Sequence, residues 1–169
     1  MDRDVRVVVD GERPPRRRGR HPLGPITIVA GTPFDLTAPR TLRTGLLADD
    51  DQIRGARGYD HCWVLVSRES AAPRRAACLS TPDGARTMEV WTTAPGLQVY
   101  TANRLDGTLT DPSGHPLGRH GAVCLETQHL PDAPNRPAHP SAVLRPGTTG
   151  RRRTESRFPR PAAQTPAPD

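Results

Sequence analysis

The stretch "TMEVWTTAPGLQVYTAN", residues 87–103, decides the fold class. Polar and apolar side chains alternate on both sides of "APG" (94–96), a typical turn sequence. Alternation with a period of two is the pattern of a β-strand that has one buried face and one exposed face. The stretch therefore predicts two strands of an antiparallel sheet.

The same pattern recurs along the middle of the chain, where short alternating segments are separated by "PDG", "LDG" and "PSG" turns. No segment keeps a 3.6-residue period over three turns. Residues 42–61 are polar and glycine-rich, and we expect Asp49, Asp50 and Asp51 to lie in a loop there. We therefore predict an all-β fold, an antiparallel sheet or sandwich. The expected strands are 61–67, 76–81, 87–93, 97–103 and 122–130.

The two ends of the chain differ in composition from the middle. Only 34% of the 169 residues are hydrophobic and 4% are aromatic, and 20 are proline. The net charge of +6 comes largely from "RPPRRRGR" (13–20) and "GRRRTESR" (150–157). Neither cluster has interleaved aromatic residues for base stacking, so we expect solvated tails, no binding to nucleic acid and no membrane contact.

This difference in composition divides the chain into three predicted segments. Residues 1–22 are predicted to be an irregular basic leader with one short possible strand, "VRVVV" (5–9), and residues 159–169 a disordered tail. Residues 23–158 form the globular part, which begins with an extended apolar run, 24–39. The three cysteines lack CxxC spacing, which predicts neither a disulfide framework nor a zinc site. No secretory or membrane-spanning segment is present in the sequence, which predicts a cytoplasmic protein.

Alternation also predicts which side chains share a face. Glu126 and Gln128 point to one side of the strand 122–130, and Leu125 and Thr127 point to the other side. Gln98 in the strand 97–103 is likewise opposite its apolar neighbours. Polar groups that converge on one side of a sheet suit a ligand with many hydroxyl groups. The same residues on an ordinary solvent face explain the pattern equally well.

Four stretches together resemble the aldose 1-epimerases, the galactose mutarotases. The resemblance runs from about residue 23 to about residue 158 and covers the C-terminal half of the family's domain. It implies a partial antiparallel β-sandwich of the galactose mutarotase type that interconverts the α and β anomers of aldohexoses such as galactose and glucose. The stretches are "GTPFDL" (31–36), "GYDHCWVL" (58–65), "PGLQVYTANRLDGTL" (95–109) and "CLETQHLPDAPNRPAHPSAVLRPG" (124–147).

The resemblance also implies roles for three residues. Glu126 is the catalytic general base, and Asp60 and Gln98 bind the substrate hydroxyls. A carboxylate is ionised at neutral pH and can accept the proton of the anomeric hydroxyl. No metal and no organic cofactor are expected.

The family carries its acid histidine in the N-terminal half of the domain, which has no counterpart in residues 1–22. Among the histidines, His61 is expected to be structural, and His129 lies on the strand face opposite Glu126. We therefore predict a truncated form with impaired activity, and an out-of-frame origin for the leader upstream of Leu23. The alternative is a non-catalytic carbohydrate-binding relative. His21, His115, His120 and His139 match no family motif or lie in loops, and none is nominated as the acid.

Overall fold

The computed structural model describes residues 26–65 and 71–160 in full, together with the backbone of four short strands within the first 22 residues. Strands dominate it, and the helices are short. In chain order the elements are β1 (Arg6–Val9), β2 (Gly11–Glu12), β3 (Arg17–Arg18), β4 (His21–Pro22), β5 (Arg40–Thr41), α1 (Leu42–Leu46), α2 (Asp51–Ala56), β6 (Asp60–Leu65), β7 (Arg74–Ser80), β8 (Thr87–Thr92), β9 (Gly96–Tyr100), β10 (Cys124–Gln128), a 3-10 turn (Ala133–Asn135) and β11 (Thr154–Arg157).

The long strands form two sheets in which every pairing is antiparallel. One sheet has five strands in the order β11-β8-β7-β1-β5, and the other has four in the order β10-β9-β6-β2. β3 and β4 pair only with each other. The predicted all-β antiparallel class is therefore confirmed. None of the helices in the described part of the chain is long and apolar enough to cross a membrane.

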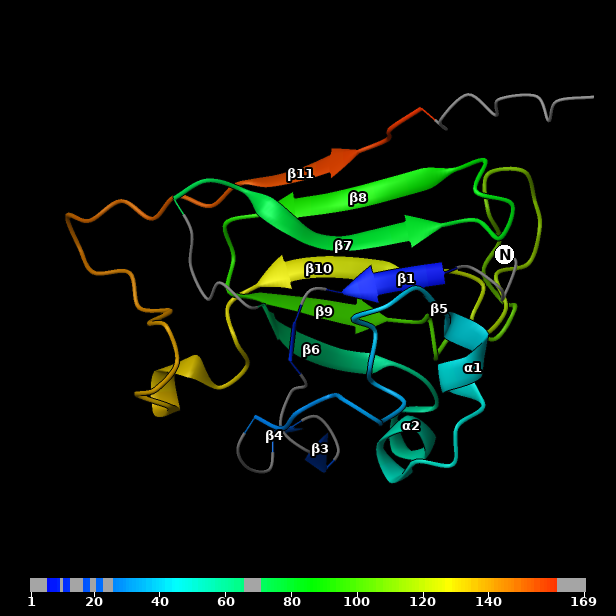
Figure 1. Ribbon diagram of the computed structural model, residues 1–169, viewed down its shortest axis with the longest axis horizontal. Coiled ribbons are helices and arrows are strands. Elements are labelled where there is room, and N and C mark those ends of the chain that lie inside the picture. The colour runs from blue at the N-terminus through cyan, green and yellow to red at the C-terminus, as the bar shows by residue number, and fades with distance from the viewer. Residues whose placement is uncertain are drawn as a thin grey trace, which may run out of the picture.

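The two sheets pack face to face around one core. Trp63 and Leu97 from the four-stranded sheet belong to the same buried cluster as Ala77 and Val90 from the five-stranded sheet. In Figure 1, β1 of one sheet crosses in front of β9 and β10 of the other. Burial of apolar side chains from two facing sheets is the arrangement of a β-sandwich.

The segment "GTPFDL" (31–36) is held against this core by aromatic side chains. The hydroxyl of Tyr59 donates a hydrogen bond to the carbonyl of Pro33 at 2.6 Å, and the indole Nε1 of Trp63 donates to the carbonyl of Phe34 at 3.1 Å. Burial raises the pKa of Tyr59 to about 12. The extended run predicted for residues 24–39 forms turns and coil in its described part, and its apolar side chains still enter the core.

Neither α-helix is predicted by the sequence pattern. The expectation of a loop at Asp50 is wrong, because its carboxylate accepts hydrogen bonds from the backbone N–H groups of Gln52 at 2.8 Å and Ile53 at 3.3 Å and so caps α2. Asp51 is the first residue of that helix. With 5 and 6 residues, α1 and α2 are too short to display a helical period in the sequence.

Short strands occur within the N-terminal segment. β1 lies between β7 and β5 in the five-stranded sheet, and β2 pairs with β6. The predicted strand "VRVVV" thus corresponds to β1, and its backbone completes the sheet because a central strand satisfies its hydrogen-bonding groups on both sides. Of the predicted tail, residues 161–169 lie outside the described residues.

Candidate functional site

Three neighbouring strands of the four-stranded sheet carry the three residues that the sequence singled out. β9 lies between β6 and β10, and Glu126 is directly opposite Gln98 in the β10–β9 register. In the β6–β9 register, Asp60 is opposite Tyr100, two residues from Gln98 along β9. Directly opposite residues point to the same face of a sheet. Asp60, Gln98 and Glu126 therefore share one face.

The opposite face of these strands packs against the core. The side chains of Asp60, Gln98 and Glu126 therefore point away from the core. Trp63, Leu97 and Leu125 alternate with the polar residues and pack in the central cluster. Glu126 is exposed, Asp60 is half-buried, and Gln98 is 7% exposed. The carboxylate of Glu126 is thus outside the core, next to the buried amide.

A direct hydrogen bond joins two of these residues. The amide Nε2 of Gln98 donates to Oδ1 of Asp60 at 2.6 Å. The other end of the amide, Oε1, is buried and accepts no hydrogen bond in the described part of the chain. A buried oxygen without a donor costs on the order of 1–3 kcal/mol. The amide oxygen is therefore a buried acceptor without a donor in the described structure.

The apolar part of this face contains Cys62, Val64 and Leu130, which form a small second cluster. Cys124 lies two residues before Glu126 on the same face of β10. Partial burial and then the nearby Glu126 carboxylate raise the pKa of the Cys124 thiol. The coulombic effect of Glu126 on this thiol follows from the position of the two residues on one face of β10.

A cavity of about 550 Å³ adjoins Asp60. Tyr100 and Arg104 also line it, and the backbone N–H of Arg104 donates to the Tyr100 hydroxyl at 3.3 Å. Tyr100 was not among the residues predicted for the site. Its spacing of two residues from Gln98 is the signal that identifies it as a wall of the site.

The histidines with described side chains lie in different surroundings from Glu126. His61 is opposite Val99 on the core-facing side, is 1% exposed and packs edge-on against Phe34 with ring centroids 4.7 Å apart. Its Nδ1 accepts a hydrogen bond from the backbone N–H of Asp60 at 3.0 Å. The imidazole ring of His61 therefore holds the backbone at Asp60 from the core-facing side of the sheet.

His120 is bound through Nδ1 to the carbonyl of Thr101 at 3.0 Å, in the turn that precedes β10. His115 contacts Asp111 within a surface turn. His129 lines a separate groove together with Arg151 and Arg152. None of these described contacts involves the carboxylate of Glu126.

The fold and the site define a two-sheet antiparallel β-sandwich with a cluster of two carboxylates and an amide on the outward face of one sheet. The family model described as aldose 1-epimerase matches residues 10–157. The chain belongs to the aldose 1-epimerase family. The match begins at residue 10, inside the segment for which the sequence predicted a leader.

Individual relatives agree with this assignment. The chain is 43% identical to galactose mutarotase of Mus musculus over 126 residues, which are 75% of this chain and 35% of that protein. It is 36% identical to aldose 1-epimerase of Escherichia coli (strain K12) over 146 residues, 85% of this chain and 41% of that protein. The chain thus spans less than half the length of these relatives.

Two solved structures are similar in fold. Galactose 1-epimerase from Lactobacillus acidophilus matches with a TM-score of 0.64 and 26% identity, over 76% of this chain and 36% of that one. An aldose epimerase homologue from C. elegans matches with a TM-score of 0.74 and 17% identity, over 94% of this chain and 46% of that one. Both likenesses support the sandwich, and the second shows the fold alone.

Proposed function

We propose that the face formed by β6, β9 and β10 binds a free aldohexose and that Glu126 acts as general base in interconverting its α and β anomers. The observation that carries the proposal is the hydrogen-bonded pair Gln98–Asp60 directly beside an exposed Glu126. Relatives named galactose mutarotase and aldose 1-epimerase support this reaction class. Galactose and glucose are the proposed substrates, and a cytoplasmic location stays a prediction from the sequence.

The reaction requires two proton transfers. The base removes the proton of the anomeric hydroxyl, the C1–O1 bond becomes a carbonyl, and the bond between C1 and the ring oxygen breaks. The ring oxygen takes up a proton as its bond breaks. Rotation about the C1–C2 bond and reversal of these steps then give the other anomer. An exposed carboxylate that is not engaged by a described cation is free to perform the first step.

Asp60 and Gln98 orient the sugar in this proposal. Oδ1 of Asp60 accepts the hydrogen bond from the Gln98 amide, which leaves the second carboxylate oxygen as an acceptor for a sugar hydroxyl. Because the Gln98 amide holds Asp60, this acceptor is fixed before the sugar binds, and this reduces the entropy that binding costs.

No histidine contact described above involves the carboxylate of Glu126. His61 lines the cavity beside Asp60 but is only 1% exposed and packs against Phe34. His120 is bound to the carbonyl of Thr101, and His129 lines a separate groove. This observation favours the alternative function, in which the chain binds a carbohydrate without catalysing its conversion. If the chain does catalyse the reaction, we expect a rate about a hundredfold to ten-thousandfold below that of a full-length relative, which is the usual loss when a general acid is missing.

Polarimetry of freshly dissolved α-glucose and α-galactose tests the proposal. We expect a rate of rotation change above that of buffer, which Glu126→Gln abolishes because an amide is not a base at neutral pH. Calorimetric titration of the same sugars should show that Glu126→Gln still binds them, whereas Asp60→Ala binds them more weakly.

Glu89→Gln is the matched control, since it removes the same charge from the five-stranded sheet and should leave the rate unchanged. Sugar binding without acceleration by the parent chain would support the non-catalytic alternative. A Glu126→Gln rate equal to the parent rate would refute the role of Glu126 as base.

A further inference from the structure

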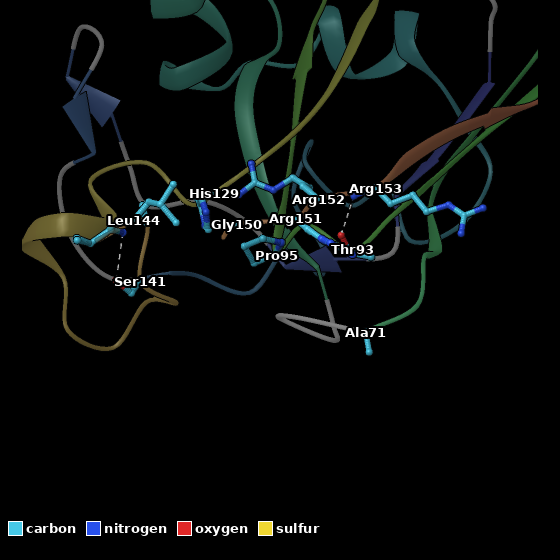
Figure 2. Close-up of a pocket in the computed structure, with 12 residues that line it drawn as sticks. Ala71, Thr93, Pro95, His129, Ser141, Leu144, Gly150, Arg151, Arg152 and Arg153 are labelled. Carbon is cyan, nitrogen blue, oxygen red and sulfur yellow. Dashed lines mark hydrogen bonds between the residues drawn. The ribbon is translucent and has the colours of Figure 1, made fainter. Parts of the chain in front are cut away.

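A wide cavity lies away from the Asp60–Gln98–Glu126 cluster, and none of these three residues lines it. Its volume is about 1220 Å³. Figure 2 shows Leu144 and Ser141 on one side of this groove and the run of Arg151, Arg152 and Arg153 on the other. The proposed sugar site therefore leaves this groove without a function.

The groove is positively charged. Three consecutive arginines line it, and none of its lining residues is Asp or Glu. Arg153 forms an ion pair with Glu155 at 2.7 Å. Arg151 and Arg152 have no ion pair with any described residue, so their two charges remain uncompensated where they meet the groove.

The opposite wall is apolar and unusually exposed. Val143 is 58% exposed and Leu144 is 64% exposed. Both belong to the irregular segment between the 3-10 turn and β11. Aliphatic side chains beside uncompensated guanidinium groups form a surface that is complementary to a partner with both acidic and apolar side chains.

Backbone groups along the groove are also available. Within the described residues, the N–H groups of Leu144, Arg151 and Arg152 donate no hydrogen bond. The end of the arginine run is fixed, because the N–H of Arg153 donates to Oγ1 of Thr93 at 3.1 Å and its carbonyl accepts from the N–H of Thr93 at 3.1 Å. An extended segment with free N–H groups, anchored at one end, can pair with another extended chain.

We propose that this groove binds an extended acidic polypeptide segment that carries aliphatic side chains. Its carboxylates pair with Arg151 and Arg152, and its aliphatic side chains pack on Val143 and Leu144. Guanidinium groups bind carboxylates through paired hydrogen bonds. Among the lining residues there is no aromatic side chain to stack on a nucleic-acid base. The open groove also exceeds the usual size of a small-molecule site, about 300–1000 Å³.

Fluorescence anisotropy with a labelled peptide of about twelve residues, built from Glu-Glu-Leu repeats, tests this proposal. We expect saturable binding that weakens at least about tenfold in the double variant Arg151→Ala, Arg152→Ala, because two charge-assisted contacts are lost. Binding should also weaken as salt is raised. Leu144→Ser should weaken it severalfold through loss of apolar contact, and a Glu-Glu-Ser peptide should bind more weakly than the leucine peptide.

Two controls match these changes. Arg43→Ala with Arg86→Ala removes the same net charge from exposed positions outside the groove, and Leu47→Ser replaces a leucine that is 76% exposed elsewhere. Both should bind the peptide as the parent does. Equal weakening by the control arginines would show a net-charge effect and overturn the proposal, as would the absence of peptide binding. Tighter, equally Arg151-dependent binding of poly-uridine, of phosphatidylserine vesicles or of inorganic phosphate would assign the groove to that ligand instead.

Discussion

Gln98 is the residue on which the candidate site depends. Its Nε2 donates a hydrogen bond to Asp60 at 2.6 Å, its Oε1 is buried without a described donor, and Glu126 lies directly opposite it on β10. An amide buried with one end unsatisfied is destabilising unless a ligand completes it. Gln98 is therefore not an ordinary solvent-face residue, because its amide is almost completely buried.

The thiol of Cys124 reports the charge on Glu126. Partial burial and the Glu126 carboxylate both raise the pKa of this thiol. Glu126→Gln removes the second cause, so the pKa falls and a larger fraction of Cys124 is thiolate at any pH below its midpoint. We expect alkylation by iodoacetamide, followed by mass spectrometry of the peptide that contains Cys124, to shift its pH profile to lower pH.

The matched variant Glu89→Gln should leave the alkylation profile of Cys124 where it is in the parent chain. An unchanged profile in Glu126→Gln would show that the two side chains do not lie on one face. Such a result would also remove the geometric basis of the proposed site.

At the scale of elements, the turn from α2 to β6 places Asp60. Gly58 has a φ of +140°, and a Cβ built there would lie 2.3 Å from Oδ1 of Asn103 and 2.7 Å from Oγ1 of Thr101. Both side chains are fixed, since Asn103 donates to the carbonyl of Tyr59 at 2.8 Å and Thr101 accepts from the N–H of Tyr59 at 3.0 Å. The turn therefore has no space for a side chain.

We expect Gly58→Ala to lower the free energy of unfolding by about 2–4 kcal/mol, because it combines a clash with an unfavourable φ. Urea denaturation followed by tryptophan fluorescence measures this loss. Gly55→Ala, within α2, is the control, since a Cβ there meets nothing within 4 Å. It should be neutral or stabilising by up to about 1 kcal/mol. Equal stability of the two variants would contradict the packing of this turn.

At the scale of the whole molecule, one loop residue joins the aromatic core of the sandwich. Phe34 is fully buried, and its ring lies near the rings of Tyr59, His61 and Trp63 at centroid distances of 5.8, 4.7 and 6.1 Å. Two of these residues belong to the strand that also carries Asp60. Stability of the sandwich and position of the site are therefore coupled through Phe34.

Phe34→Ala should lower the free energy of unfolding by about 3–5 kcal/mol, the usual cost of a large aromatic deletion in a core. Phe158→Ala is the control, because Phe158 is 72% exposed, and its effect should stay within about 0.5 kcal/mol. Thermal and urea unfolding provide the two measurements. A small effect of Phe34→Ala would show that the segment 31–36 does not pack as described.

The sequence by itself determined the strands β6 to β10 and their faces. It was wrong about residues 154–157, which were expected in a solvated tail and instead form β11, paired with β8. Alternation is a local property, and it correctly separated Gln98 from Leu97 and Glu126 from Leu125. The roles proposed for Asp60, Gln98 and Glu126 come from the resemblance to the aldose 1-epimerases. The match of that family's model to residues 10–157 confirmed that the chain belongs to the family.

Only the tertiary structure decided which strands are neighbours and what lies between them. The order β10-β9-β6, which brings Glu126 and Asp60 to either side of β9, depends on pairings between residues far apart in the chain. The two helices were missed because each is shorter than the window in which a helical period is visible. The groove between Leu144 and Arg151 is formed where the 141–153 segment meets His129 and Thr93. Long-range packing sets such contacts, and local alternation carries no information about them.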